Sequence, residues 1–179
     1  MLKRLALAIA VAGALVGLAP AIASAHGPSR QKVVSTIEIN APLDKVWAVI
    51  GNFQDMSWHP AFAKTEGTGD SAAGATRTLT LQSGGKIEEK LIKHSDEDKA
   101  LAYEITNVDV KDVPVTNYTA TISAKGTTER TIVEWKGAFY RGYVNNDPPP
   151  ELSDEAAVKA ITGVYQDGLA ALKKKLEGS

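Results

Sequence analysis

The sequence predicts an α+β fold, in which a curved antiparallel sheet of about seven strands surrounds one long C-terminal helix. Residues 153–177 carry apolar side chains at intervals of three or four, which indicates one buried helix face. The preceding segments alternate apolar and polar residues, as strands do, and short turns join them. Such hairpins favour antiparallel pairing, with the long helix packed on one face of the sheet.

The first 25 residues have the pattern of a secretory signal peptide. Lys3 and Arg4 precede an apolar run over residues 5–18, and Ala23-Ser24-Ala25 is a small-residue cleavage site. The run is shorter than the roughly 20 residues of a membrane-spanning helix. We therefore expect a signal peptide at 1–25, a single domain at 26–179, export to the periplasm and no membrane contact after cleavage. An uncleaved anchor is the alternative.

Composition excludes several classes of site. The absence of cysteine rules out disulfides, a thiol nucleophile and a thiolate metal site. Loss of Lys3 and Arg4 leaves 18 of the 20 basic residues against 21 acidic ones, and the charges are interspersed. This balance argues against a nucleic-acid partner, which calls for a basic face. We expect no cofactor, because no dinucleotide, phosphate or zinc-protease motif is present.

Two short helices are expected after a first strand at residues 31–40. Pro42 suits the first position of a helix, Trp47 lies on its apolar side, and Gly51 is placed to end it. Residues 52–63 are aromatic and broken by proline, which favours a second short helix or a structured loop.

The next strands follow from a period of two. They are expected at residues 76–81, 86–94 and 100–108, with further strands around Tyr118 and Trp135. A tight turn at Ser83-Gly84-Gly85 joins the first two of these strands. Pro148-Pro149-Pro150 ends the sheet, and Ser153 is a good N-cap for the long helix.

Arg77 and Glu89 are the most informative polar residues. Each is in phase with apolar neighbours on its strand, and a charge on an apolar face is costly unless it is paired or hydrated. An ion pair closing the sheet interior and a polar fixture for a ligand's hydroxyl, carbonyl or carboxylate are both consistent with this placement. A register error of one residue would instead leave both side chains in solvent.

Aromatic residues support a cavity between sheet and helix. Tyrosine and tryptophan keep a polar group that needs a partner when buried, whereas a solid core favours Leu, Ile and Phe. The predicted cavity set is Trp58, His59, Arg77, Glu89, Tyr103, Tyr118, Trp135 and Tyr140. Packing in an ordinary core is the alternative for each aromatic residue. Gly163 and Gly168 cost helix stability, which suggests close approach of the sheet or room for a ligand.

Histidine offers little further chemistry. His94 borders a charged turn and is expected at the surface, and we assign no catalytic residue and no metal site. After cleavage His26 would be the N-terminal residue, where amine and imidazole together can chelate copper. A terminus without a metal is the alternative.

The ordered set of motifs resembles a known superfamily. It comprises Asn40-Ala41-Pro42 with Val46-Trp47, Trp58-His59-Pro60, Gly74-Ala75-Thr76-Arg77, Glu89-Lys90-Leu91, Tyr103 and the C-terminal helix. These features are similar to the SRPBCC (START-like, helix-grip) ligand-binding domains, which include polyketide cyclases. The resemblance implies that the positions of Arg77 and Glu89 face the cavity.

A narrower resemblance points to a role in methanol oxidation. His26-Gly27-Pro28, Val46-Trp47-Ala48-Val49-Ile50-Gly51 and Trp58-His59-Pro60 are similar to the MxaD family of periplasmic accessory proteins. This resemblance implies that the partners are a quinoprotein methanol dehydrogenase and its cytochrome c. Two other functions stay open: a carrier of a small apolar or amphipathic ligand, and a cyclase or dehydratase with Glu89 or His59 as general base.

Overall fold

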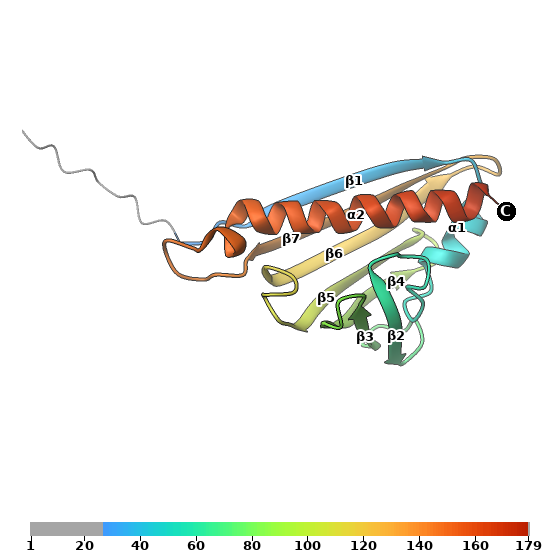
Figure 1. Ribbon diagram of the computed structural model, residues 1–179. Coiled ribbons are helices and arrows are strands. Elements are labelled where there is room, and N and C mark those ends of the chain that lie inside the picture. Colours follow the sequence, from blue (N-terminus) through green and yellow to red (C-terminus); the bar gives the residue numbers. More distant parts are fainter. Residues whose placement is uncertain (1–26, 179) are drawn as a thin grey trace, which may run out of the picture.

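The computed structural model describes residues 27–178, which form one curved seven-stranded sheet and a long helix (Figure 1). The expected signal peptide at 1–25 and His26 lie outside the described residues. The elements are β1 (Gln31–Ile39), α1 (Leu43–Ile50), β2 (Phe62–Thr68), β3 (Thr76–Leu81), β4 (Lys86–Ser95), β5 (Ala100–Val108), β6 (Val115–Gly126), β7 (Thr131–Arg141), the short 3-10 helix η1 (Pro150–Leu152) and α2 (Asp154–Glu177). No helix within residues 27–178 has the length and apolar content that crossing a membrane requires.

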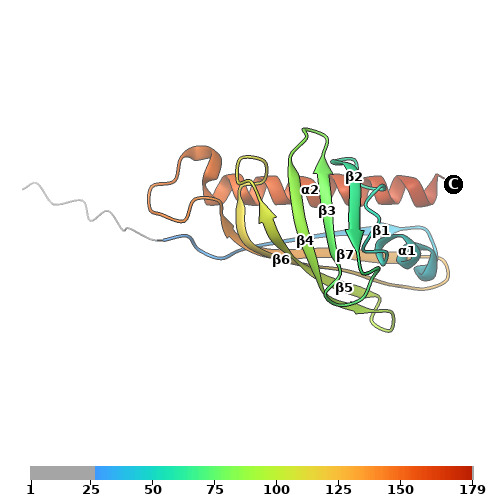
Figure 2. The same cartoon turned by 90° about the horizontal axis from the view of Figure 1, so that it is seen from below.

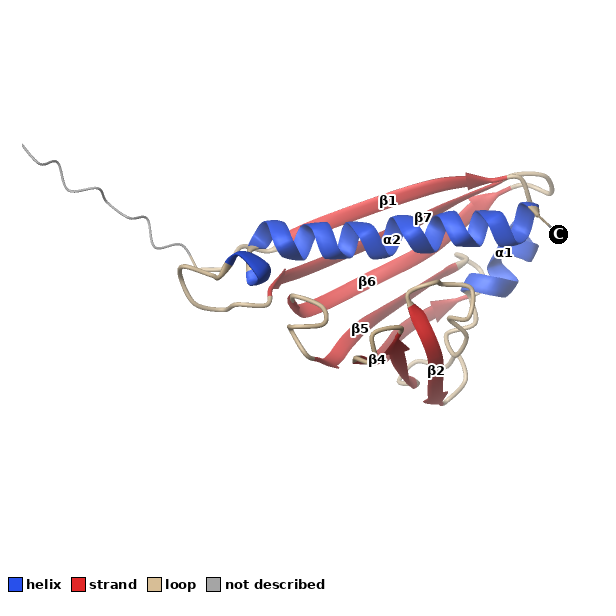
Figure 3. Cartoon of the chain, viewed as in Figure 1, coloured by secondary structure: helices blue, strands red, loops and turns tan. Residues whose placement is uncertain are grey.

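The sheet is antiparallel throughout and wraps around one side of the helix. Its strand order is β1-β7-β6-β5-β4-β3-β2, so β1 and β2 form the two edges. Helix α2 packs on β1 and β7, while β2, β3 and β4 bend away from that pair (Figures 1 and 2). Figure 3 shows α2 on one face of the sheet and α1 near the C-terminal end of α2. The α+β fold expected from the sequence is confirmed.

Helix α2 forms where its periodicity and end signals agree. Ser153 caps it, because the side-chain oxygen accepts a hydrogen bond from the Ala156 N–H at 3.1 Å. Acidic residues occupy the first turn, and Lys174 and Lys175 the last, as the helix dipole favours. The side chains buried against the sheet include Ile161, Tyr165, Leu169, Leu172 and Leu176.

The second short helix expected after β1 is absent from the described structure; the structured loop is what forms. Residues 52–61 are a series of turns. The side-chain oxygen of Asn52 accepts a hydrogen bond from the Gln54 N–H at 3.1 Å, and that of Asp55 accepts one from the Ser57 N–H at 2.8 Å. Such local bonds compete with the helical hydrogen bonds, and Pro60 has no N–H to contribute.

A bulge in β6 determines which face Tyr118 joins. The β6–β7 register shifts between Thr116 and Thr119, and Asn117 has a φ of 48°. Val115 and Tyr118 are both buried although they are three residues apart. Because side chains alternate in a regular strand, the extra residue is what turns Tyr118 toward the interior.

Candidate functional site

A small internal cavity lies between the sheet, α2 and the loop before β2. Its volume is about 40 Å³, and it is lined by Met56, Phe62, Arg77, Leu79, Leu81, Ile87, Glu89, Tyr103, Ile105, Val113, Tyr118, Trp135, Ile161 and Val164. A water molecule takes about 30 Å³ in the liquid. Pockets for drug-sized ligands are roughly 300–1,000 Å³. The hollow predicted from the sequence is therefore present, but side chains fill most of it, and an organic ligand requires them to move.

Arg77 and Glu89 form a buried ion pair on one wall of this cavity. They lie opposite each other in the β3–β4 register and are 4% and 5% exposed. Arg77 Nε donates to Glu89 Oε2 at 2.6 Å, and Nη1 donates to the Phe53 carbonyl at 2.6 Å. The guanidinium also lies 4.2 Å from the centre of the Phe53 ring. The ion-pair interpretation is thus confirmed, and the alternative with both residues in solvent is wrong.

The charge state of the pair follows from two opposing effects. Burial raises the pKa of Glu89, because the carboxylate is separated from water, while the adjacent Arg77 acts in the opposite direction. The arginine is held by Glu89 and the Phe53 carbonyl together. The pair therefore presents no uncompensated charge to a ligand.

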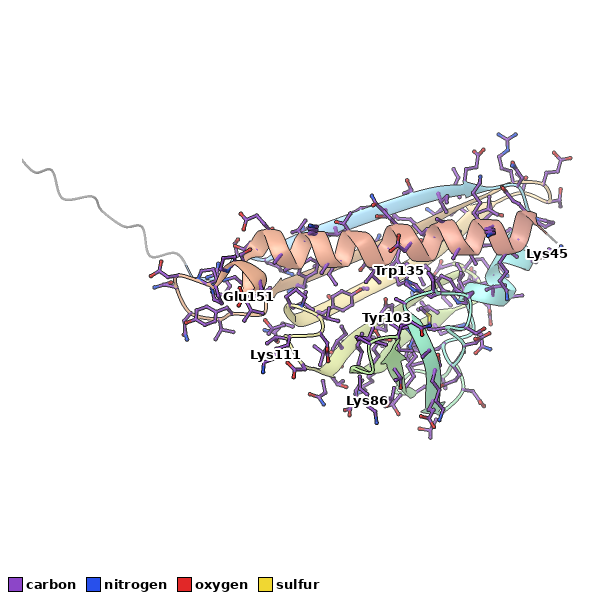
Figure 4. All side chains as sticks on the ribbon, viewed as in Figure 1. Lys45, Lys86, Tyr103, Lys111, Trp135 and Glu151 are labelled. Carbon is purple, nitrogen blue, oxygen red and sulfur yellow. The ribbon has the colours of Figure 1, made fainter. Side chains whose placement is uncertain are left out.

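A network of aromatic polar groups occupies the centre of the molecule. Trp135 Nε1 donates to the Tyr103 hydroxyl at 3.0 Å, and the Tyr118 and Tyr165 hydroxyls are 2.6 Å apart. Tyr103 and Tyr118 are joined by a long 3.5 Å contact. The rings of Trp135 and Tyr165 stack with centroids 4.6 Å apart, which links β7 to α2. Figure 4 labels Tyr103 and Trp135, which lie in the region between α2 and β4.

The three tyrosines remain protonated in this environment. Burial raises the pKa of Tyr103, Tyr118 and Tyr165, because a phenolate would be poorly solvated there. The hydroxyls act as neutral hydrogen-bonding groups, and the network has no anion that could accept a proton from a substrate.

His59 holds the loop to α2 and does not line the cavity. Its ring is 1% exposed, with Nε2 2.9 Å from the Val164 carbonyl and Nδ1 accepting from the Ala61 N–H at 3.1 Å. A neutral ring with its proton on Nε2 satisfies both contacts. Burial lowers the pKa of His59, which favours this neutral form. Trp58 also lies outside the lining and packs against Trp135, with ring centroids 5.9 Å apart.

The placement of Tyr140 in the cavity set was wrong. Along β7, Trp135, Phe139 and Arg141 are buried, whereas Tyr140 is half-buried on the opposite face. The Arg30 guanidinium lies over its ring, 5.8 Å from the centroid. Trp135 and Tyr140 are five residues apart on β7, so strand alternation places them on opposite faces of the sheet. The prediction had been based on the aromatic ring of Tyr140 and not on its position in the strand.

Five of the eight predicted residues meet at the cavity: Arg77, Glu89, Tyr103, Tyr118 and Trp135. Met56 and Phe62 were not predicted. Met56 lies among turns, which have no periodicity, and Phe62 is the first residue of β2, directly after those turns. Ile161 and Val164 of α2, which also line the cavity, were not predicted either. Ile161 was recognisable from the apolar face of the helix, since a residue on that face must lie against the sheet or the space beneath it.

Two further expectations concern histidine. Residues 27–178 contain no cluster of three or more His, Cys, Asp or Glu side chains that could hold a metal ion. His26, the N-terminal chelate candidate, lies outside that range. His94 is half-buried and not fully at the surface, because Nε2 lies 3.0 Å from the Gly51 carbonyl and the ring packs on Trp47.

Comparison with known proteins identifies the family. Residues 30–177 match the polyketide cyclase/dehydrase and lipid transport family. The protein XoxI from Bacillus cereus is 33% identical, with a TM-score of 0.68 over 81% of this chain and 94% of that one. A protein from Nitrosospira multiformis is 27% identical, with a TM-score of 0.67 over 82% of this chain and 96% of that one.

A plant enzyme shares the fold at lower identity. Norcoclaurine synthase from Thalictrum flavum, solved with dopamine and hydroxybenzaldehyde, is 20% identical and has a TM-score of 0.62 over 83% of this chain and 87% of that one. This similarity concerns the fold alone. The family match, which spans nearly all of the described residues, leads to one conclusion: the chain belongs to the polyketide cyclase/dehydrase and lipid transport family, of the SRPBCC type.

Proposed function

We propose that this protein is a periplasmic, non-catalytic accessory domain that works by contacting partner proteins. The proposed partners are a quinoprotein methanol dehydrogenase and its cytochrome c. The signal-peptide pattern and the similarity to the MxaD family support the location and the partners. The fold is compatible with ligand binding. The choice between an accessory protein, a ligand carrier and an enzyme therefore depends on the space and the polar groups in the interior.

One observation carries the proposal: the polar groups of the interior bind one another, in a cavity of about 40 Å³. Glu89 is bound by Arg77, and both nitrogens of His59 have backbone partners. A general base needs a free lone pair within reach of the substrate proton. His59 offers none here, and the Glu89 carboxylate, held through Oε2 by Arg77, faces a cavity too small for an organic substrate. Both facts favour a surface function over the cyclase or dehydratase mechanism.

The test measures electron transfer between the two proposed partners. Purified methanol dehydrogenase and cytochrome c are mixed with and without this protein, and the rate of cytochrome reduction is followed together with direct binding. We expect binding to one partner and a faster reduction. Absence of both effects would refute the proposal.

Tyr103→Phe is the matched interior variant for this assay. It removes one cavity hydroxyl and leaves the ring in place, so a surface function keeps the full acceleration. Loss of the acceleration in folded Tyr103→Phe protein would instead assign the function to the cavity.

A second candidate is a carrier of a small apolar ligand, favoured by the mainly apolar lining of the cavity. Native mass spectrometry of protein purified from its host tests it. A bound mass that disappears in a cavity-filling Val113→Phe variant would support the carrier, and repeated absence of any bound mass would count against it.

A further inference from the structure

The outer face of the sheet, opposite the cavity, carries a depression of about 340 Å³. It is lined by Lys32, Val34, Ile92, Ala102, Thr119, Ala120, Thr121, Lys136, Gly137 and Ala138. Val34 and Ile92 are 60% and 48% exposed, although large apolar side chains are usually covered. We call this surface the outer patch. None of its residues takes part in the ion pair or the hydroxyl network of the interior.

The sequence forms the outer patch from small residues on three adjacent strands. Thr119 lies opposite Ala138 in the β6–β7 register, and Thr121 lies opposite Ala102 in the β5–β6 register. Their short side chains leave the middle of the sheet low. Ile92 rises beside them, because the β4–β5 register shifts between Leu91 and Lys93. The result is an apolar hollow with raised sides on a face that no element of residues 27–178 covers.

Cations surround this apolar hollow. Lys32 and Lys136 line it, Lys93 lies opposite Ala102, and Arg30 donates from Nη2 to the Thr119 hydroxyl at 3.3 Å. Lys90 lies one row further along β4, opposite Glu104.

Acidic residues balance only part of this charge. Glu134 binds Lys136 at 3.2 Å, and Asp98 binds Lys93 at 3.4 Å. Within residues 27–178, Arg30, Lys32 and Lys90 take part in no ion pair. Two further carboxylates lie near Lys90: Glu104 is opposite it, and Glu88 is two residues before it on the exposed face of β4. The outer patch is therefore positive, although the whole chain has a net charge of −1.

We propose that the outer patch docks an acidic protein surface with an apolar centre. The inference rests on the proposed function, because it says which face meets the partner. Charge complementarity selects this occupant: carboxylates on the partner would meet Lys32, Lys136 and Arg30, while apolar groups would cover Val34 and Ile92. A second copy of the chain is a poor occupant, since a symmetric contact would bring the same lysines together.

Site-specific photo-crosslinking in the native host tests the proposal. A photoreactive phenylalanine analogue replaces Ala102 in the full chain, and the adducts are identified by mass spectrometry. A second protein carries the analogue at Glu66, which is exposed on β2 away from the outer patch. We expect an adduct from position 102 alone, to a segment of another protein rich in Asp and Glu.

Charge reversal supplies the second arm. Combining Lys32→Glu and Lys136→Glu with the analogue at position 102 is expected to lower the adduct yield about tenfold, because like charges would then face each other. Lys45→Glu with Lys111→Glu, both away from the outer patch, is expected to leave the yield unchanged. Circular dichroism of each protein shows that it is folded.

The remaining outcomes overturn the proposal: no adduct above that from position 66, an adduct to a second copy or to residues 1–26 of the same chain, or a yield insensitive to charge reversal. The result also separates the two proposals. An acidic partner other than the dehydrogenase or cytochrome would uphold the outer patch and refute the proposed function. Binding of the dehydrogenase or cytochrome without an adduct at position 102 would do the reverse.

Discussion

At the scale of single residues, the buried pair of Arg77 and Glu89 gives the clearest prediction about stability. The two charges are separated from water, and each depends on the other and, for Arg77, on the Phe53 carbonyl. Removing one partner leaves a buried charge, whereas removing both restores an apolar wall. Removing one member of the pair is therefore expected to cost more unfolding free energy than the intact pair contributes relative to apolar side chains.

The Glu89→Gln variant is expected to lose about 3–5 kcal/mol of unfolding free energy, because Arg77 would stay buried without its counter-ion. The double variant Arg77→Met with Glu89→Leu is expected to recover most of that loss. Urea denaturation of the three proteins measures the difference. Glu66→Gln, in the exposed pair with Lys64, is the control and should not change the midpoint. A double variant as unstable as Glu89→Gln would contradict the argument.

At the scale of elements, the two internal glycines of α2 have different surroundings, and only Gly168 lies at a close contact. A Cβ at Gly168 would collide with the ring of His59 and lie 3.1 Å from Trp135, so this glycine allows the loop and the sheet to approach the helix. A Cβ at Gly163 would meet nothing within 4 Å. The suggestion of close approach is therefore confirmed at Gly168 and wrong at Gly163.

The two glycines provide a matched pair of variants. Gly163→Ala is expected to stabilise the protein by up to about 1 kcal/mol, because alanine is the better helix former. Gly168→Ala is expected to destabilise it, because His59 must move away from Val164 and the packing on Trp135 loosens. Thermal unfolding of both variants checks the opposite signs, and a Gly168→Ala protein as stable as Gly163→Ala would show that the contact yields freely.

At the scale of the whole molecule, His59 joins the loop before β2 to α2, and its protonation makes the stability of the protein depend on pH. Its folded pKa lies below the ordinary 6.5, so the unfolded chain binds the proton more readily. Stability from this residue is complete above pH 6.5 and is lost as the pH falls through the folded pKa. Glu89, whose pKa is raised, acts in the opposite sense, losing stability as the pH rises through its folded pKa.

The His59→Gln variant isolates the histidine contribution. Glutamine can donate to the Val164 carbonyl and accept from the Ala61 N–H, but it does not titrate. Denaturation of both proteins between pH 7.5 and pH 5 is expected to show a gap in unfolding free energy that narrows as the pH falls, since Glu89 is present in both. A constant gap would show that His59 titrates alike in the folded and unfolded chains, which would contradict a lowered folded pKa.

The predicted parts of the fold and the site share one property: each depended on a local period. The apolar face of α2, the strands and the interior position of Arg77 and Glu89 follow from spacings of 3.6 and 2, which burial enforces. The turns at 52–61 were ambiguous, because side-chain bonds at Asn52 and Asp55 decide them. The bulge at Asn117 was not predicted, because a single extra residue changes the alternation of apolar and polar residues at one position only, and the alternation continues normally after it.

The sequence by itself determined the α+β architecture, the interior placement of one opposite charge pair and the excess of polar aromatic residues there, because alternation and helical spacing assign each side chain to a face. Only the tertiary structure decided how much space remained inside. The cavity of about 40 Å³ is what is left when side chains from α2, the sheet and the loop interdigitate, and such packing depends on distances between elements far apart in the chain. The same holds for the outer patch, whose residues come from five strands and meet only when the register brings them together.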